Sequence, residues 1–210
     1  MKKGLFITFE GPDGSGKTTV STFVTQRLLD LGYDVVHTRE PGGIDIAEQI
    51  RKVILDPKNT AMDVRTEALL YAASRRQHLI EKVLPALDQG KIVLCDRFVD
   101  SSLAYQGFAR KIGIDNVLSI NEFAIEGHYP DLTLYFDVDA ETGLKRIKHR
   151  EFLDRLDQEA LSFHSDVVTG YQEVVSRFNH RIVKINANQA IETVQEEALN
   201  TVLQKVKAHV

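Results

Sequence analysis

Cysteine is nearly absent from this sequence of 210 residues, which contains only Cys95. A single cysteine cannot form a disulfide within the chain, so we expect a reducing, cytoplasmic location. Long hydrophobic runs are also missing, since nothing approaches the roughly 18 apolar residues of a membrane span. The apolar N-terminal stretch meets an acid at Glu10, too early for a signal-peptide core. We therefore expect no membrane partner.

An excess of basic residues is missing as well. Lys and Arg together number 26 against 30 Asp and Glu, which gives a net charge of −4. A broad nucleic-acid-binding surface needs a positive field, so we expect no nucleic-acid partner. Apolar residues make up 43% of the chain and charged residues 27%, which is typical of a globular protein with a full core.

Five short segments rich in β-forming residues are separated by segments with helical periodicity. The expected strands are 5–10, 34–38, 91–96, 132–138 and 181–186. The first, third and fourth are nearly continuous apolar runs, as in strands that are covered on both faces. Helical spacing is clearest over 17–30 and 191–206. This alternation predicts an α/β fold, a parallel sheet with helices on both faces, whose ligands bind at the carboxyl ends of the strands.

A glycine-rich segment with the sequence Gly-Pro-Asp-Gly-Ser-Gly-Lys-Thr follows the first expected strand, at residues 11–18. It matches G-x-x-x-x-G-K-[ST], a phosphate-binding loop whose backbone N–H groups point at phosphate oxygens. Lys17 would reach the outer phosphates of ATP, and the Thr18 hydroxyl would bind Mg²⁺. The residues expected to hold the nucleotide are Gly11, Asp13, Gly14, Ser15, Gly16, Lys17, Thr18 and Thr19.

The third expected strand ends in Asp96 and Arg97. Asp96 is placed to hold Mg²⁺ through a water molecule, and Arg97 is placed to grip a second phosphate group. A structural salt bridge at the end of a strand is the alternative. The chain lacks the Asn-Lys-x-Asp segment of a guanine-specific GTPase.

Tyr71, Ser74 and Arg75 share one face of an expected helix, because they are spaced i, i+3 and i+4. An aromatic ring, a hydroxyl and a guanidinium suit a base to stack on and a phosphate to pair with. The alternative is a core tyrosine with two solvated polar neighbours.

Ser102, Tyr105 and Gln106 share a helix face in the same way. The amide of Gln106 offers a donor and an acceptor together, which could read the edge of a pyrimidine. A glutamine on a helix is more often simply solvated.

Two further segments carry charges that could face a substrate. Glu40 lies in the turn after the second strand, and Arg51 lies in the helix that follows. The stretch 145–159 is dense in charge and is either an exposed helix or a mobile lid that brings an arginine to the transferring phosphoryl group.

These pieces together resemble the thymidylate kinase family in its bacterial form. The matching pieces are 9–19, 38–43, 71–75, 96–98, 101–107, 129–133 and 154–157. The resemblance implies transfer of the γ-phosphoryl group of ATP to thymidine 5′-monophosphate (dTMP). It also implies a P-loop NTPase-type three-layer fold with a five-stranded parallel sheet, and a homodimer. Residues 1–210 would form one nucleoside-monophosphate-kinase-like domain with a mobile lid at about 148–158.

The resemblance also assigns roles at the base. Arg75 and Gln106 would contact thymine, Tyr71 would stack on it, and Ser102 would lie close to it; Ser74 shares the Tyr71 face. Family members mostly carry Phe where this chain has Tyr71.

At the sugar and the acceptor phosphate, the resemblance implies a second set of contacts. Asp13 would accept a hydrogen bond from the 3′-hydroxyl, and Tyr105 would crowd the 2′ position. Arg51 and Arg97 would hold the acceptor phosphate, with Glu40 near it and the magnesium.

The acceptor phosphate has a second pKa of about 6, so it is largely ionised at neutral pH and needs no general base. Catalysis by such a site needs positive charge instead. Lys17, Asp96, Arg97 and Arg155 are the expected catalytic residues. Ser15 stands where a loop arginine would otherwise lie, which implies that the catalytic arginine is in the lid. Arg155 lies in the matching piece 154–157, and Arg150 in a stretch that aligns less well.

The residues alone leave two alternative functions open. One is another P-loop nucleotide or nucleoside kinase, and the other is a nucleotide-binding switch ATPase. The preference for thymidylate over deoxyuridylate also stays open, since one methyl group contributes only about 1–3 kcal/mol in a pocket.

Overall fold

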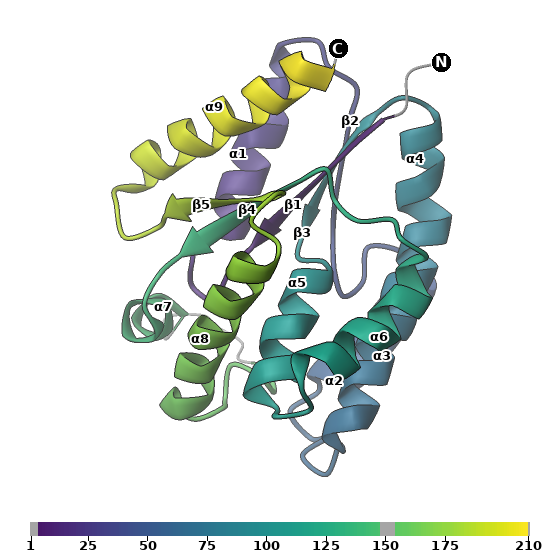
Figure 1. Ribbon diagram of the computed structural model, residues 1–210, viewed down its shortest axis with the longest axis vertical. Helices are drawn as coiled ribbons and strands as arrows, with labels where there is room; N and C mark the ends of the chain where they lie inside the picture. The colour runs from purple at the N-terminus through teal and green to yellow at the C-terminus, as the bar shows by residue number, and fades with distance from the viewer. Residues whose placement is uncertain (1–3, 148–153, 210) are drawn as a thin grey trace.

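The computed structural model of the protein describes residues 4–147 and 154–209. It contains one sheet of five parallel strands in the order β2-β3-β1-β4-β5 (Figure 1). The strands are β1 (Leu5–Glu10), β2 (Val35–Arg39), β3 (Ile92–Asp96), β4 (Leu132–Asp137) and β5 (Ile182–Asn186). Each strand lies within one residue of its predicted bounds. The predicted α/β fold with a five-stranded parallel sheet is confirmed.

Helices cover both faces of this sheet because β1, β3 and β4 are apolar on both faces. On one face, α1 (Lys17–Asp30) and α9 (Ile191–His209) pack over Ile7 and Phe9 of β1 (Figure 1). The opposite face of β1 presents Phe6 to a second core. Two apolar layers therefore sandwich the strand that leads into the phosphate-binding loop.

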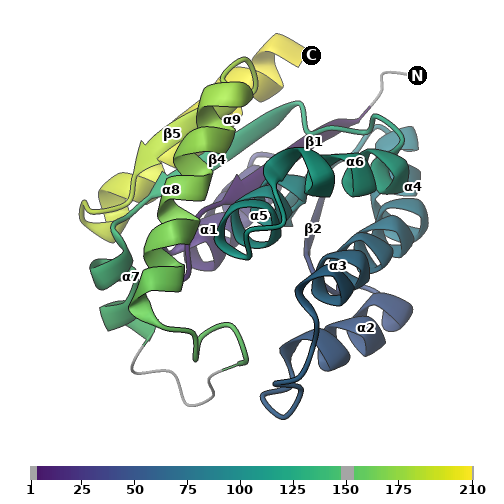
Figure 2. The ribbon, with the colours of Figure 1, turned by 60° about the horizontal axis from the view of Figure 1, so that its bottom comes forward.

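The second core is covered by the remaining long helices, several of which are continuous with one another. Helix α3 (Val64–His78) continues through the π-helical stretch η1 (Leu79–Val83) into α4 (Leu84–Asp88). Helix α5 (Val99–Ser102) continues into the π-helical stretch η2 (Leu103–Ala109). Helices α6 (Ile114–Ile125) and α8 (Leu161–Arg177) complete this layer. Two further helices, α2 (Asp45–Leu55) and α7 (Ala140–Ile147), lie near the carboxyl edge of the sheet (Figure 2). No helix within residues 4–147 and 154–209 is long and apolar enough to cross a membrane.

Strand register brings the site residues to one edge. Phe9 of β1 and Arg39 of β2 both pair with Asp96 of β3, so three parallel strands end side by side. The loops that follow them must share the space above that edge. Figure 2 shows α2 and α3 on one side of this space and α7 and α8 on the other.

Candidate active site

The phosphate-binding loop joins β1 to α1 and takes the backbone shape that its glycines allow. Gly14 and Gly16 have φ angles of 75° and 85°, in the left-handed region. Gly16 is the N-cap of α1, it makes no side-chain capping bond, and the first turn of α1 carries no acid. The N–H groups of that turn therefore remain available for an anion.

The loop is also held from outside, by α7. A Cβ at Gly14 would lie 2.1 Å from the carbonyl oxygen of Gly143, and a Cβ at Gly143 would lie 2.5 Å from that of Asp13. The two backbones thus touch, and neither position has room for a side chain. The packing of α7 fixes the shape of a loop that glycine alone would leave free.

Lys17 lies over this loop, where the motif predicts it. Its side chain is buried, and its Nζ donates a hydrogen bond to the carbonyl of Pro12 at 3.0 Å. Burial lowers the pKa of Lys17 to about 8, and the neighbouring Arg97 acts in the same direction. A bound phosphate would raise this pKa again, because a neighbouring negative charge stabilises the ammonium form, so the site favours an anion here.

Thr18 and Asp96 meet at the start of α1, because Thr18 Oγ1 donates a hydrogen bond to Asp96 Oδ2. A hydroxyl and a carboxylate oxygen are the hard ligands that Mg²⁺ prefers, so this pair fits the ion. In the part of the chain that the structure describes, no three His, Cys, Asp or Glu side chains cluster to hold a metal alone. A magnesium ion here would need further oxygen ligands, from water or from phosphate.

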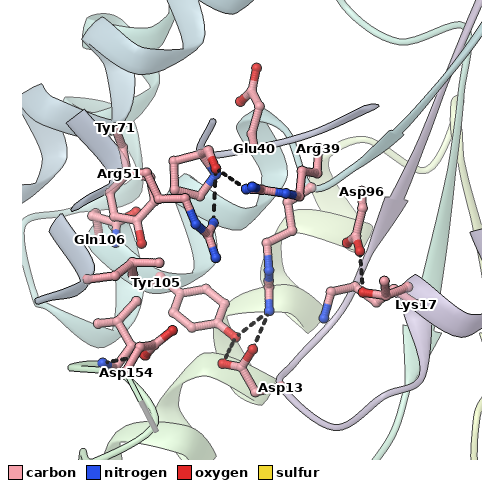
Figure 3. Close-up of a pocket in the computed structure, with 15 residues that line it drawn as sticks. Asp13, Lys17, Arg39, Glu40, Arg51, Tyr71, Asp96, Tyr105, Gln106 and Asp154 are labelled. Carbon is pink, nitrogen blue, oxygen red and sulfur yellow. Dashed lines mark hydrogen bonds and ion pairs between the residues drawn. The ribbon is translucent and has the colours of Figure 1, made fainter. Parts of the chain in front are cut away.

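Arg97 follows β3 and contacts the phosphate-binding loop. Figure 3 shows Asp13 of this loop and its neighbour Tyr105 in the pocket. Arg97 has a φ of 71°, which is unusual for a residue with a side chain. Its Nη1 donates to the Gly11 carbonyl at 3.0 Å, and its Nη2 donates to Asp13 Oδ1 at 2.6 Å. The Tyr105 hydroxyl donates to Asp13 Oδ2 at 2.7 Å. Burial raises the pKa of Tyr105 well above its usual value, so this hydroxyl stays a donor.

A buried carboxylate lies behind Arg97. Glu10 Oε2 accepts hydrogen bonds from the hydroxyls of Ser101, at 2.5 Å, and Tyr171, at 3.0 Å. Arg97 Nη1 donates to these same two hydroxyls, at 3.0 and 3.2 Å. Burial, reinforced by the nearby Asp100, raises the pKa of Glu10 to about 7. Glu10 thus fixes the two hydroxyls that hold Arg97 over the loop.

Two more guanidiniums line the pocket beside the loop after β2. Arg39 and Arg51 each donate from Nη1 to the carbonyl of Pro41, both at 2.9 Å (Figure 3). Burial, followed by the repulsion of Arg39, lowers the pKa of Arg51. Together with Lys17 and Arg97 they put four cations on the wall of one pocket. Such a wall suits a phosphate group.

Glu40 also lines the pocket, but its carboxylate is already occupied. Its Oε2 accepts from Arg75 Nε at 2.8 Å, and its Oε1 lies 2.9 Å from His78 Nδ1. Both partners belong to α3. Glu40 therefore fastens the loop after β2 to α3, which sets the distance between the cations and the base side of the pocket.

The base side of the pocket is a wall of side chains from separate elements. Leu55 ends α2, Tyr71 comes from α3, Tyr105 and Gln106 come from η2, and Leu156 follows the undescribed stretch 148–153. Gln106 and Tyr71 both line the pocket and are labelled in Figure 3. A flat ring and an amide at this wall can stack on a planar base and hydrogen-bond to its edge.

Ser74, Arg75 and Ser102 do not reach this wall. Ser74 is fully buried, and its Oγ has no partner among the described residues. Arg75 lies beneath the wall, where its Nη1 donates to Ser102 Oγ at 3.0 Å and its Nη2 to the Phe98 carbonyl at 2.9 Å. Ser102 and Gln106 both face α3, where Ser102 accepts from Arg75 and Gln106 donates to Glu67, but only Gln106 lines the pocket. Their roles toward a substrate stay predictions.

Arg155 also points away from the phosphate-binding loop. Its Nε donates to the Ile54 carbonyl at 2.9 Å, and its Nη2 donates to Glu67 Oε2 at 2.5 Å. These bonds tie residue 155 to α2 and α3. Arg150 and most of the predicted lid lie outside the described residues.

Several pocket residues were not predicted from the sequence. They are Arg39, Pro41, Leu55, Asp154 and Leu156. Apart from Leu55, these residues lie inside the quoted pieces 38–43 and 154–157, so a signal existed. Glu67, which contacts Gln106 and Arg155, was not predicted either. The only sequence feature that pointed to it was its place one helical turn before Tyr71, on the same helix face.

Comparison with known proteins agrees with this geometry. The family model described as Thymidylate kinase matches residues 9–198. A thymidylate kinase of Geobacillus sp. (strain WCH70) is 57% identical over 208 residues, which cover 98% of this chain and 99% of that protein. One of Anoxybacillus flavithermus is 60% identical over 196 residues, covering 92% and 93%.

A solved structure is similar as well. The crystal structure of thymidylate kinase from Ehrlichia chaffeensis superposes with a TM-score of 0.78 at 34% identity, covering 96% of this chain and 99% of that one. Sequence and fold therefore agree over nearly the whole chain, and the protein belongs to the thymidylate kinase family.

Proposed function

We propose that this chain transfers the γ-phosphoryl group of ATP to dTMP, giving dTDP and ADP, in the pocket at the carboxyl edge of the sheet. One observation carries the proposal: a phosphate-binding loop, four cations and a wall with Tyr71 and Gln106 surround the same space. A donor phosphate and a planar acceptor nucleotide can therefore meet there. Family membership supports the same reaction.

The donor side would be held by the loop and by α1. The N–H groups at the start of α1 and the Lys17 ammonium would bind the ATP phosphates, and Thr18 and Asp96 would hold Mg²⁺. The magnesium ion, when bound, supplies positive charge that neutralises the phosphate oxygens. These groups lower the repulsion that keeps two phosphates apart.

The acceptor side would be held by the opposite wall. Tyr71 would stack on thymine, and Arg51 and Arg97 would bind the acceptor phosphate in the cationic part of the pocket. Asp13 carries both the Arg97 and the Tyr105 bonds, and in this proposal it exchanges one of them for the sugar 3′-hydroxyl. No general base is needed, because the acceptor phosphate is already ionised.

In this proposal residues of the segment 148–158 close over the acceptor. Arg155 reaches the transferring phosphoryl group only by leaving Glu67 and the Ile54 carbonyl. Arg155→Ala is then expected to lower kcat more than it raises KM for dTMP, since an arginine of this kind contributes about 10³-fold. An unchanged kcat would remove Arg155 from the transition state.

We also propose a homodimer formed through α2, α3 and α6. These helices pack side by side and expose several large apolar side chains. They are Ile46 and Val53 of α2, Leu69 of α3 and Phe123 of α6. Phe123 is 89% exposed, which is costly for a phenylalanine on a lone subunit. Phe123→Glu should give a monomer by sedimentation, whereas Leu31→Glu, a change in the turn after α1, should not.

The prediction of a cytoplasmic location is supported by Cys95, which is buried and free. The prediction of one domain over residues 1–210 is supported by the single sheet, whose two faces carry both cores.

The first experiment measures ADP formation from Mg²⁺-ATP with dTMP, dUMP, UMP, dCMP, AMP, GMP and no acceptor. Turnover mainly with dTMP supports the proposal. Equal ADP formation without any acceptor would instead favour a switch ATPase, and preference for a purine would favour another nucleotide kinase.

A further inference from the structure

Glu67 is a buried carboxylate beneath the base side of the pocket, and the proposed reaction gives it no role. It lies in the first turn of α3 and is 1% exposed. Its Oε1 accepts a hydrogen bond from Gln106 Nε2 at 2.8 Å. Its Oε2 accepts from Arg155 Nη2 at 2.5 Å and from Arg110 Nη2 at 3.2 Å. One side chain thus joins α3, η2 and the segment after residue 153.

These contacts fix the Glu67 carboxylate in place. Two guanidiniums reach its carboxylate from different elements, so it has charged partners despite its burial. Arg110 is itself held, because it lies over the Phe163 ring and pairs with Glu159 at 2.6 Å. The orientation of the Glu67 carboxylate is therefore set before any substrate binds.

A fixed carboxylate also fixes the direction of the Gln106 amide. An ionised carboxylate only accepts hydrogen bonds, so Gln106 must present its NH₂ group to Glu67. The flipped amide would place two oxygens against each other in a buried site, which is strongly unfavourable. The Gln106 carbonyl oxygen, which has no partner among the described residues, is thereby left for the pocket that Gln106 lines.

We infer that Glu67 is a positioning residue that makes the pocket select pyrimidine nucleotides with a protonated N3. This inference rests on the proposed function and refines its substrate class. A carbonyl oxygen at the base edge accepts the N3–H of thymine or uracil. Cytosine carries an unprotonated N3 with a lone pair, which the same oxygen repels. Glu67 thus sets the preference without touching the substrate.

The test compares Glu67→Gln with the unmodified chain, using kcat/KM for dTMP and for dCMP. A glutamine at 67 can donate as well as accept, so the Gln106 amide can turn. The ratio of the two kcat/KM values is expected to fall by about tenfold or more, the effect of one hydrogen bond gained by the wrong base. Dissociation constants for the two nucleotides, measured by calorimetry without ATP, should shift in the same sense.

Two matched variants separate this role from a structural one. Arg155→Ala removes one of the two guanidinium partners of Glu67 but leaves the bond to Gln106, so the ratio should stay unchanged even if both rates fall. Glu159→Gln weakens only the outer pair with Arg110 and should change neither rate. Glu67→Asp keeps the negative charge but moves it away from Gln106, so it should also lower the ratio of kcat/KM for dTMP to that for dCMP. This variant replaces Glu67→Gln in the test if Glu67→Gln folds poorly.

Equal losses for dTMP and dCMP in both Glu67 variants would overturn the inference and leave Glu67 a structural residue. Failure of the proposed function would look different. The unmodified chain would then release ADP at the same rate whichever nucleotide is offered, and the inference would fall with it.

Discussion

The two ends of the pocket are built in different ways. The end proposed to bind the ATP phosphates is one short segment, residues 11–18, with the backbone N–H groups at the start of α1 and the side chains of Lys17 and Thr18. The base end is assembled from α2, α3, η2 and the residues after 153. The first end therefore has its binding groups in one segment, which α7 holds in shape, whereas the second end has groups that only the packing of distant helices brings together.

This difference predicts which substitutions affect every substrate and which affect only the choice of acceptor. Changes at the phosphate end should lower turnover for all acceptors equally, because ATP is common to every reaction. Changes at the base end should alter the ranking of acceptors. The following expectations run from the largest effect to the smallest.

Lys17→Ala should have the largest effect. The ammonium is buried over the loop, and losing one such electrostatic contact to the transition state lowers kcat by about 10³-fold. Steady-state rates with dTMP and with dUMP should fall by the same factor. Unequal losses would show that Lys17 also contacts the acceptor.

Gly14→Ala should destabilise the protein by about 3–4 kcal/mol, since it combines left-handed strain with overpacking. Gly14 has a φ of +75°, and its Cβ would lie 2.1 Å from the Gly143 carbonyl. The free energy of unfolding in urea measures the effect.

Gly32→Ala is the matched control for that substitution. Gly32 has a φ of +84°, but a Cβ added there would meet no atom within 4 Å, so only strain of about 1–2 kcal/mol is expected. Equal losses for the two variants would mean that contact with α7 does not shape the loop.

Glu10→Gln tests the carboxylate behind Arg97 through the pH dependence of stability. The pKa of Glu10 rises from 4.5 to about 7 on folding, so its contribution to stability is fully present below pH 4.5 and is lost as the pH rises through 7. In the variant, an amide can keep the same partners because the Ser101 and Tyr171 hydroxyls can reverse their bonds. Between pH 4.5 and 8 the free energy of unfolding of the unmodified protein should therefore fall by about 2–3 kcal/mol more than that of the variant.

Urea unfolding of both proteins at several pH values gives that difference. Parallel stability curves would show that Glu10 has the same proton affinity in the folded and unfolded chains.

Tyr71→Phe should have the smallest effect. No hydrogen bond from the Tyr71 hydroxyl is found in the part of the chain that the structure describes, and the ring alone provides a stacking surface. We expect a change below about 0.5 kcal/mol, which is less than about threefold in KM for dTMP. Tyr71→Ala is the contrasting variant and should raise that KM strongly while leaving the KM for ATP unchanged.

The sequence by itself determined the sheet and the phosphate end of the pocket. Short, nearly continuous apolar runs that alternate with helical segments favour strands covered on both faces, and the motif over residues 11–18, between a strand and a helix, predicts a phosphate-binding loop. The meeting of Thr18 with Asp96 also followed, because parallel strands end at one edge.

Only the tertiary structure decided the base end. Helical spacing placed Ser102 and Gln106 on one face, and both contact α3, but Ser102 pairs with Arg75 beneath the pocket whereas Gln106 pairs with Glu67 and lines the pocket. Arg155 joined Glu67 instead of facing the phosphate-binding loop. The physical reason is that these partners lie far apart in the sequence and are chosen by burial, because a charged group that loses water must take whichever partners the packed helices offer.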